Sequence, residues 1–501
     1  MTRTMELDAV IIGSGAGGGT VAERLAPLAE AGARIAVLEE GHHFPLAYFT
    51  QREVEMMGLF RYGGGWPIKD GSITLAAGRG LGGSTLVYTG VTFRLPDAVC
   101  EKWGVPGLTP KDLAPRFERL EKDLSVIVPG DDMVNDNNRL FAEACETLGW
   151  EVKKIPLNLS GCEQEGFCNL GCATGAKQGA MAVQLPRAQK AGVVLVPNCR
   201  VEKIGRGKVS AKVSEPPPGT VPGPWEPGEV EISAKRIVCA AGSPATPGLL
   251  LAAGLEKELP ALGRYFTLHP AMTLYGVMPH PIKNYQGFPK TYYTPRFSQT
   301  HHFYLETAFY YPFVSTKHLG LWGEDLARIM TRYANFMTVI ALNHDPASEK
   351  NRIRLSRKGE VIMDYTIAKE SVESLAHAQV AATRLFIAAG CREMVMPMAK
   401  KPVFTPADAG DKSLEEFISP KRFLPIKTPL SSAHPQGGCR MGAGPEDSVT
   451  DPWGKVHGRE DLYVADASLF PQSSAVNPYL TVMALADRVG QKLVESADSW
   501  G

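Results

Sequence analysis

The first forty residues alternate between apolar and polar positions in a way that predicts one β-α-β unit. Residues 7–13 (LDAVIIG) are typical of a buried strand, and residues 16–31 have the spacing of an amphipathic helix. Residues 33–40 (ARIAVLEE) predict a second strand that ends on two acids. This order of elements is expected at the start of a parallel sheet covered by helices.

The pattern then changes several times along the chain. A glycine-dense loop region is expected at 62–90, helices over 97–150 with Thr109 as N-cap, and a cysteine-rich loop at 161–175. Short strands (VVLVPN, CRVEKI, KVSAKVS and EVEISA) surround a proline-rich segment at 215–228, which we expect to be an exposed hairpin loop or linker. The run KRIVCAAGS predicts another strand, which ends at Gly242.

Aromatic, strand-like segments fill residues 266–345, and the last hundred residues return to an α/β pattern with a long helix from Pro478. We therefore predict an α/β protein, α+β overall, in which a Rossmann-like cofactor domain is interrupted by a sheet-rich substrate-binding domain. The predicted domain boundaries are as follows: 1–96, 192–265 and 430–501 for the discontinuous cofactor domain, and 97–191 and 266–429 for the substrate domain with its loop 161–175.

Composition and charge exclude several classes of protein. The 501 residues include 53 Lys and Arg and 53 Asp and Glu, so we expect no nucleic-acid partner. The uncharged stretch 237–255 contains Pro244 and Pro247, which favour a strand, a turn and a short helix over a membrane span. No signal-peptide pattern opens the chain, so we predict a cytoplasmic protein, and the nine cysteines then do not imply a disulfide framework.

A dinucleotide-binding fingerprint lies between the first predicted strand and helix. Gly13, Gly15 and Gly18 form GxGxxG, which allows a tight turn, close approach of a pyrophosphate and close packing of helix and strand. Glu39 follows 21 residues after Gly18, where an acid can accept hydrogen bonds from ribose hydroxyls. The motif does not separate FAD from NAD, but an acid at this position disfavours the 2′-phosphate of NADP.

Two residues near the other end are candidates for proton transfer. His434 lies in a Pro/Gly loop (SSAHPQGGCRMG), and imidazole titrates near neutrality, so it suits removal of a hydroxyl proton. Asn477 precedes Pro478 and could orient a substrate oxygen, although a plain helix N-cap is an equally good explanation.

Taken together, these motifs resemble the glucose–methanol–choline (GMC) flavoprotein oxidoreductases along nearly the whole chain. Five segments match in order: GxGxxG with Glu39, GRGLGGST (78–85), GSPATPGLLLAAGL (242–255), HP-x-GGC at His434, and VNP at Asn477. The GGC and VNP spellings look most like the cholesterol-oxidase and long-chain-alcohol branches.

The resemblance implies FAD that takes a hydride from an alcohol carbon, with roles for individual residues. His434 falls on the active-site histidine and Asn477 on the second active-site position, which also lies at the flavin. Asp466 matches an acid that contacts the flavin, and Arg79, Gly82, Gly83 and Ser84 fall in the loop along the cofactor. Val87 and Tyr88 stand where a flavin-tethering His and a frequent Asn are found, so we expect non-covalent FAD.

The three cysteines of the loop 161–175 leave two interpretations open. Cys162, Cys168 and Cys172 are spaced as C-x5-C-x3-C, which could hold a [3Fe–4S] cluster, or zinc with a fourth ligand. Similar spacing occurs in iron–sulfur-carrying dehydrogenase subunits of the family. The alternative is a cysteine-lined structural loop.

We expect an enzyme that oxidises an apolar, sterol-like or long-chain alcohol and passes electrons to oxygen, a quinone or an electron-transfer protein. The aromatic stretch 284–313 favours an apolar pocket, and Glu306 within it is expected to face outward on its strand rather than serve as a pocket acid. A sugar or polyol dehydrogenase is the alternative if the cysteines bind iron. The GMC scaffold also hosts non-redox hydroxynitrile lyases.

Overall fold

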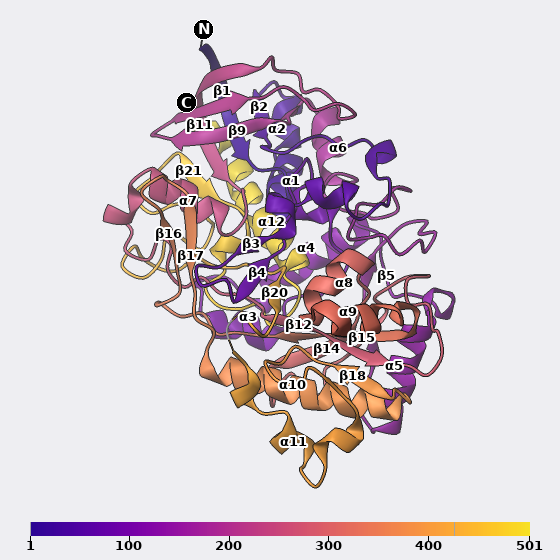
Figure 1. Ribbon diagram of the computed structural model, residues 1–501. Helices are drawn as coiled ribbons and strands as arrows, with labels where there is room; N and C mark the ends of the chain where they lie inside the picture. The colour runs from indigo at the N-terminus through magenta and orange to yellow at the C-terminus, as the bar shows by residue number, and fades with distance from the viewer. Residues whose placement is uncertain (1, 425, 501) are drawn as a thin grey trace.

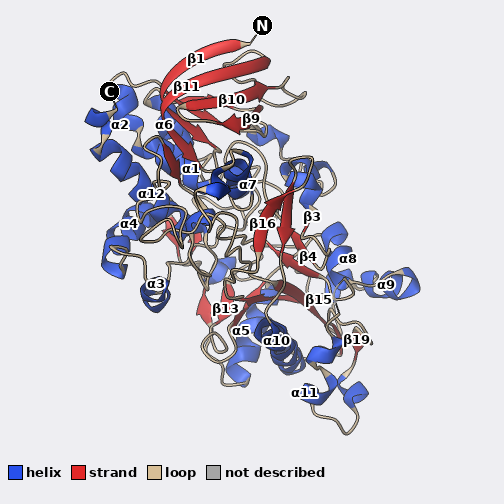
Figure 2. Ribbon diagram, turned by 90° about the vertical axis from the view of Figure 1, so that its left-hand side faces the viewer, coloured by secondary structure: helices blue, strands red, loops and turns tan. Residues whose placement is uncertain are grey.

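The computed structural model describes residues 2–424 and 426–500. In these ranges the strands form two large sheets, one in the upper half of the molecule and one in the lower half (Figure 1). Both ends of the described chain lie near the first sheet, in the upper part of the molecule (Figures 1 and 2).

The first sheet has the strand order β8-β2-β1-β11-β10-β9, with β21 also paired to β11. Its central pairs, β1 with β2 and with β11, are parallel, whereas β9 and β10 add an antiparallel edge. The bounds are β1 (Arg3–Ile12), β2 (Ile35–Leu38), β8 (Val194–Val196), β9 (Cys199–Ile204), β10 (Lys208–Val213), β11 (Gly228–Cys239) and β21 (Leu462–Val464).

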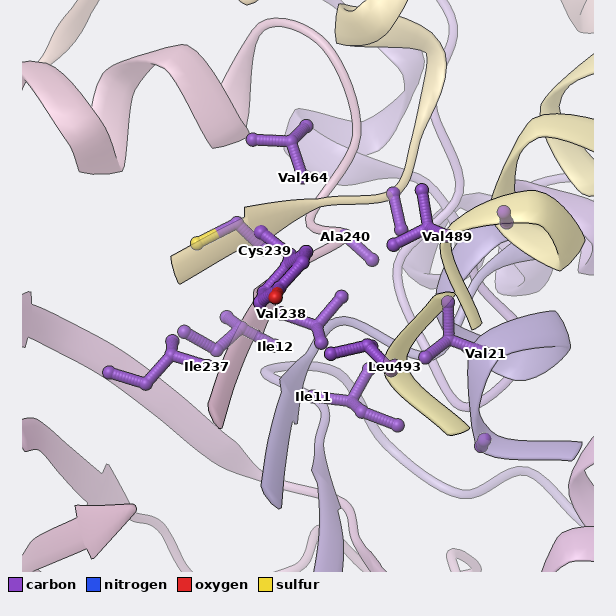
Figure 3. Close-up of a cluster of buried hydrophobic side chains, with 14 of the residues drawn as sticks. Ile11, Ile12, Val21, Ile237, Val238, Cys239, Ala240, Val464, Val489 and Leu493 are labelled. Atoms are coloured by element: carbon purple, nitrogen blue, oxygen red, sulfur yellow. The ribbon is translucent and has the colours of Figure 1, made fainter. Parts of the chain in front are cut away.

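Helix α1 (Ala16–Arg24) packs on α12 (Tyr479–Glu495) and on α6 (Gln184–Lys190) against this sheet. The core between them includes a large apolar cluster: Ile11 of the sheet lies beside Val21 of α1 and Leu493 of α12 (Figure 3). Removal of this surface from water is the main term that holds the layer together.

The second sheet has the order β3-β4-β20-β12-β15-β14-β13-β6, with β18 and β19 beside β12. Helix α10 (Lys369–Ala388) packs on its strands β12, β14 and β15 (Figure 2). The bounds are β3 (Trp66–Pro67), β4 (Ile73–Leu75), β6 (Lys153–Lys154), β12 (Ala271–Val277), β13 (Tyr292–Thr294), β14 (Phe303–Thr307), β15 (Phe336–Asn343), β18 (Glu393–Val395), β19 (Val403–Phe404) and β20 (Leu430–Ser432).

The remaining elements connect or flank the two sheets. The other helices are α2 (Ala26–Glu30), α3 (Asp97–Trp103), α4 (Pro110–Asp123), α5 (Asp136–Thr147), α7 (Ala245–Ala252), α8 (Pro312–Leu319), α9 (Gly323–Met330) and α11 (Leu414–Phe417). Two small antiparallel sheets pair β5 (Val126–Ile127) with β7 (Leu157–Asn158) and β16 (Arg352–Leu355) with β17 (Val361–Asp364). Short 3₁₀ turns, among them Gly83–Leu86, lie in the loops.

The chain crosses from one sheet to the other at more places than the predicted domain boundaries imply. Helix α4 follows residue 96, yet it packs on α12 and shares the core of the first sheet. Strands β3 and β4 precede residue 96 and lie in the second sheet. The division into domains stays a prediction.

Several local expectations can be compared directly with the structure. Thr109 caps α4, since its hydroxyl accepts from the Asp112 N–H at 3.2 Å. The helix expected over 16–31 is broken at Leu25 into α1 and α2, and the two strands expected over 229–242 are one long strand, β11. The proline-rich segment joins the antiparallel strands β10 and β11. Among the helices that the structure describes, none has the length and apolarity needed to traverse a bilayer.

Candidate active site

The predicted fingerprint forms the turn from β1 to α1. Gly13 has φ +100° and sits so close to Ala240 O that a Cβ would approach it to 2.3 Å. A Cβ on Gly17 or Gly18 would meet a backbone oxygen within 2 Å, whereas one on Gly15 would have 3.8 Å to the nearest atom. No side chain caps the start of α1 at Gly15. Its first amide groups and its positive dipole end therefore suit a phosphate.

Glu39 lies at the end of β2, as predicted, and is nearly buried. Its carboxylate accepts from the Ser14 hydroxyl at 2.6 Å, the Ser14 N–H at 3.2 Å and the Gly41 N–H at 2.8 Å. Burial raises the pKa of this carboxyl. Ser14 in turn accepts from the Gly82 N–H at 3.0 Å, so Glu39 ties the fingerprint turn to the second glycine loop.

The loop 78–85 lies directly against the fingerprint. Gly83 approaches Gly15 so closely that a Cβ on Gly83 would stand 2.7 Å from the Gly15 Cα. Ser84 is exposed, and its hydroxyl accepts from the Gly78 N–H at 3.0 Å. Arg79 points away to Glu40, with 3.7 Å between Nε and Oε1. The structure thus brings Gly82 and Gly83 to the turn but directs the Arg79 side chain to a surface ion pair.

Asp466 follows β21 and joins it to the start of α7. The carboxylate accepts from the Gly242 N–H at 2.8 Å, the Thr246 hydroxyl at 2.5 Å and the Ser468 N–H and hydroxyl at 2.8 and 2.5 Å. Burial raises its pKa. These bonds hold two chain segments together, so any contact of Asp466 with a cofactor would come in addition to a structural role.

His434 lies beside a second histidine that the sequence analysis did not single out. Its Nδ1 is 3.1 Å from Nδ1 of His269, and the rings are edge to face. His344 lies against the far side of His269, with 5.6 Å between ring centroids. Burial, with smaller effects of Lys290 and His344, lowers the pKa of His434 to about 3, so it is neutral at pH 7.

Asn477 is brought to the same region. Ser474, three residues before it, donates its N–H to Gln436 Oε1 at 2.9 Å, which joins the segment of Asn477 to that of His434. Helix α12 begins at Tyr479 with Pro478 as its N-cap, and within the described residues the buried Asn477 Oδ1 has no hydrogen-bond partner. Asn477 is therefore not a helix cap, and its amide is available to a bound group.

A cavity of about 170 Å³ opens at Asn477. Aromatic and apolar side chains make up most of its wall, with one arginine: Phe93, Arg94, Pro96, Tyr293, Tyr304 and Val476. The Tyr304 ring also contacts His344, at 5.1 Å between centroids, which links this cavity to the histidine cluster. A larger hollow of about 480 Å³ lies between β8 and the proline-rich segment, away from every candidate residue. We place the site at the smaller cavity because only it adjoins the candidate chemistry.

Glu306 does not face outward, as we had expected. It lies on β14 between β13 and β15, its side chain is 1% exposed, and its carboxylate pairs with Lys290 Nζ at 2.5 Å. The apolar neighbours on the strand gave no signal of this, because the paired lysine is sixteen residues away in the sequence. An ion pair removed from water at this depth requires its partner, since one charge alone would be strongly destabilising.

The structure gives no support to the interpretation of the cysteine loop as a metal centre. Cys162 and Cys168 pack against an apolar cluster that includes Val91 and Phe288, and all three thiols are free. Across the described part of the chain, no group of three or more His, Cys, Asp or Glu side chains is arranged to hold a metal ion. The predicted iron–sulfur cluster therefore has no support here, and the structural interpretation fits these contacts.

The loop instead surrounds a buried lysine. Lys177 Nζ donates to the backbone oxygens of Leu86 at 2.7 Å, Tyr88 at 2.8 Å and Cys168 at 2.6 Å. Burial lowers its pKa to about 8. Lys177 thus fastens the end of the glycine loop 78–88 to the cysteine loop.

The residues present fit a flavin dinucleotide. The uncapped start of α1, the acid at the end of β2 and the glycine loop beside them supply a phosphate site, a ribose acceptor and room for close backbone approach. The unpartnered amide oxygen of Asn477 adds an open acceptor near the histidines.

Comparison with known families identifies the relatives of this chain. Two family profiles, both described as GMC oxidoreductase, match residues 56–271 and 346–486. An uncharacterized GMC-type oxidoreductase of Mycobacterium tuberculosis is 32% identical over 97% of this chain and 76% of its own length. A long-chain-alcohol oxidase of Arabidopsis thaliana is 28% identical over 99% of this chain and 67% of its own length.

Solved structures share the fold at lower identity. Pyridoxine 4-oxidase from Mesorbium loti superposes with a TM-score of 0.71 at 18% identity, covering 98% of this chain and 99% of that one. A formate oxidase variant from Aspergillus oryzae gives a TM-score of 0.73 at 16% identity and covers both chains fully. At these identities the likeness establishes the architecture.

Proposed function

Because the chain belongs to the GMC oxidoreductase family and is an FAD-dependent oxidoreductase, we propose that it oxidises an apolar, long-chain or sterol-like alcohol at the cavity beside Asn477. The observation that carries the proposal is a neutral, partly buried His434 in a cluster that adjoins an aromatic cavity. The long-chain-alcohol oxidase relatives support the substrate class and favour oxygen as the electron acceptor.

In this proposal FAD is bound non-covalently and supplies the hydride acceptor. Gly13 and Gly15 would hold its pyrophosphate, Gly18 lets α1 pack on β1, and Glu39 would accept from the ribose. His434 would take the hydroxyl proton at Nε2, the bound flavin would supply the acceptor for the hydride from the alcohol carbon, and Asn477 would orient the alcohol oxygen. Because burial keeps His434 uncharged, its lone pair is available for the proton at pH 7.

The test is a stopped-flow measurement on the FAD-bound enzyme. Anaerobic mixing with a panel of long-chain alcohols and sterols should bleach the flavin absorbance, and oxygen uptake should follow in air. His434→Ala should retain FAD and slow reduction about 10²–10⁴-fold, the usual contribution of a general base. His280→Ala removes an exposed histidine and serves as the matched control.

Two results would change the proposal. Near-normal reduction by His434→Ala would remove His434 from the base role. Absence of reduction by every alcohol would favour the non-redox alternative, and iron with acid-labile sulfide in the purified protein would favour a sugar or polyol dehydrogenase. The cytoplasmic location stays a prediction, which fractionation of the expressing cells can check.

A further inference from the structure

His269 occupies a position that nothing in the proposed chemistry yet uses. It lies just before β12, is completely buried, and has a partner at each ring nitrogen. Its Nδ1 is 3.1 Å from His434 Nδ1, and its Nε2 is 2.8 Å from the Ser473 hydroxyl. Both ring nitrogens of a buried histidine need partners, and here one of those partners is the candidate base His434.

We propose that His269 is a positioning residue, which shares one proton with His434 and thereby fixes both the ring orientation and the tautomer of the base. The inference rests on the proposed function of His434. It concerns a residue that would touch neither alcohol nor flavin and would act only through His434.

The count of protons carries the argument. Two nitrogens 3.1 Å apart cannot both bear hydrogen, and without any hydrogen between them they would repel. Burial lowers the pKa of His269 well below its usual value, so neither ring adds a second proton at pH 7. One proton therefore lies between the two Nδ1 atoms. The ring that carries this proton determines whether His434 Nε2 is unprotonated and able to act as a base.

A base at Nε2 requires the proton on His434 Nδ1. His269 then accepts at Nδ1, carries its own hydrogen on Nε2 and donates it to Ser473 Oγ. That oxygen also accepts from the Ala475 N–H at 3.2 Å, so its position is fixed by the backbone of the segment that leads to Asn477. The arrangement links the base to the loop that carries its catalytic neighbour.

Gln436 favours the opposite arrangement, which makes the assignment testable. Its Oε1 accepts from Ser474, so its amide nitrogen faces His269 Nε2 at 3.1 Å and the His434 carbonyl at 3.3 Å. If Gln436 donated to His269, that ring would donate from Nδ1 and leave a hydrogen on His434 Nε2. We assign the hydrogen to the shorter contact, with Ser473, and direct the amide of Gln436 to the carbonyl.

Other charged groups near the pair do not replace this role. Lys290 and His344 face His434, and Glu306 neutralises Lys290. His344 has no hydrogen-bond partner at Nε2 within the described residues and adjoins His269 by ring contact alone. Within the described residues, none of these three side chains is hydrogen-bonded to His434 Nδ1.

The first experiment observes the resting holoenzyme and does not depend on the substrate. ¹⁵N-labelled histidine is incorporated, and the signals of His434 and His269 are assigned from their loss in His434→Gln and His269→Gln. We expect a through-hydrogen-bond ¹⁵N–¹⁵N coupling between the two Nδ1 atoms, with His434 unprotonated at Nε2. Absence of the coupling, or a protonated His434 Nε2, would overturn the proposal even if alcohol oxidation is confirmed.

The second experiment measures kinetics with an alcohol that reduces the flavin. His269→Leu should lower kcat about 10²-fold, as expected for a misplaced reacting group, and change KM less than about threefold. His269→Gln should recover part of kcat because its amide oxygen can accept from His434 Nδ1–H. His318→Leu is the matched control, since it also removes a neutral histidine with one hydroxyl partner, Thr273, on β12.

The possible outcomes distinguish failure of the proposed function from failure of the positioning role. If no alcohol of the panel reduces the flavin of the wild-type enzyme, the proposed function fails, and the NMR coupling alone tests the role of His269. If His434→Ala is slow but His269→Leu keeps kcat within about threefold, the positioning role fails. If His269→Leu does not fold, His269→Gln and the coupling still give a decision.

Discussion

The stability of the cofactor layer should depend strongly on one buried carboxylate, that of Asp487 on α12. Its side chain is 1% exposed and accepts from Arg24 of α1 at 2.5 Å and from Arg116 and Arg119 of α4 at 2.7 and 2.6 Å. Three helices therefore meet at one acid. Truncation to Ala would leave three guanidinium groups around a desolvated space.

The size of the effect follows from these contacts. Loss of one partner from a buried charge pair costs about 3–5 kcal/mol. Arg116 and Arg119 retain Asp112 and Asp123 as second partners at 3.5 and 3.0 Å, which keeps the estimate within that range rather than three times larger. We expect Asp487→Ala to lower the free energy of unfolding by about 3–5 kcal/mol. Asp487→Asn should lose about half as much because the amide oxygen still accepts.

The assay is urea unfolding of the holoenzyme, followed by far-UV circular dichroism and by FAD fluorescence. In Asp487→Ala the FAD fluorescence transition should shift to lower urea concentrations and coincide with the first unfolding step, because α1 carries the cofactor turn. Asp136→Ala is the control, since this exposed acid pairs with Arg139 at the surface and its loss should change stability by about 0.5 kcal/mol or less. A loss under about 1 kcal/mol for Asp487→Ala would refute the reasoning.

Three further predictions concern the cofactor site and its pH dependence. The Gly15→Ala methyl group would have 3.8 Å of room, so this variant should fold but bind FAD about tenfold or more weakly. Gly17→Ala puts a methyl group 1.8 Å from Ala465 O and should not fold stably. FAD retention by Gly15→Ala equal to that of wild type in ultrafiltration would contradict a pyrophosphate at this turn. Lys177→Met removes three hydrogen bonds to the two loops and should weaken FAD binding in fluorescence titration, whereas Lys190→Met, at an exposed position, should not. Burial holds the pKa of His269, His344 and His434 below that of the unfolded chain, so the unfolded state takes up protons first as the pH falls. Stability should therefore decline below about pH 6.5, by up to about 1.4 kcal/mol per pH unit for each histidine, and urea midpoints that stay constant from pH 7 to 5 would contradict this.

Local motifs were predictable from the sequence, and the partners of distant residues were not. Gly13, Gly15, Gly18 and Glu39 are spaced by the geometry of a single turn and the strand after it, so their positions follow from 39 consecutive residues. The pairing of His434 with His269 spans 165 residues and depends on β20 lying beside β12 in the second sheet. No local pattern near His269 indicates that contact.

The errors have similar physical causes. An alternating strand pattern assigns a face but not what covers it. Glu306 lies on the face of β14 opposite to Phe303 and Leu305, and it is buried there with Lys290. Cysteine spacing fixes how far three thiols can be apart along the chain. It does not fix their directions, and here Cys162 and Cys168 face an apolar cluster. Side-chain direction is a tertiary property.

The parallel pairing of β1 with β11 has a consequence for how the protein is made. The amino-terminal strand ends at Ile12, and its partner begins at Gly228, so about 216 residues separate two neighbours in the sheet. At about 5–20 residues per second, a ribosome needs roughly 10–45 s to deliver the second strand. During that interval the edge of β1 that later pairs with β11, including the apolar residues Val10–Ile12, has no permanent partner. Synthesis rate and chaperone supply, rather than the final stability of the sheet, should then govern the yield of folded protein.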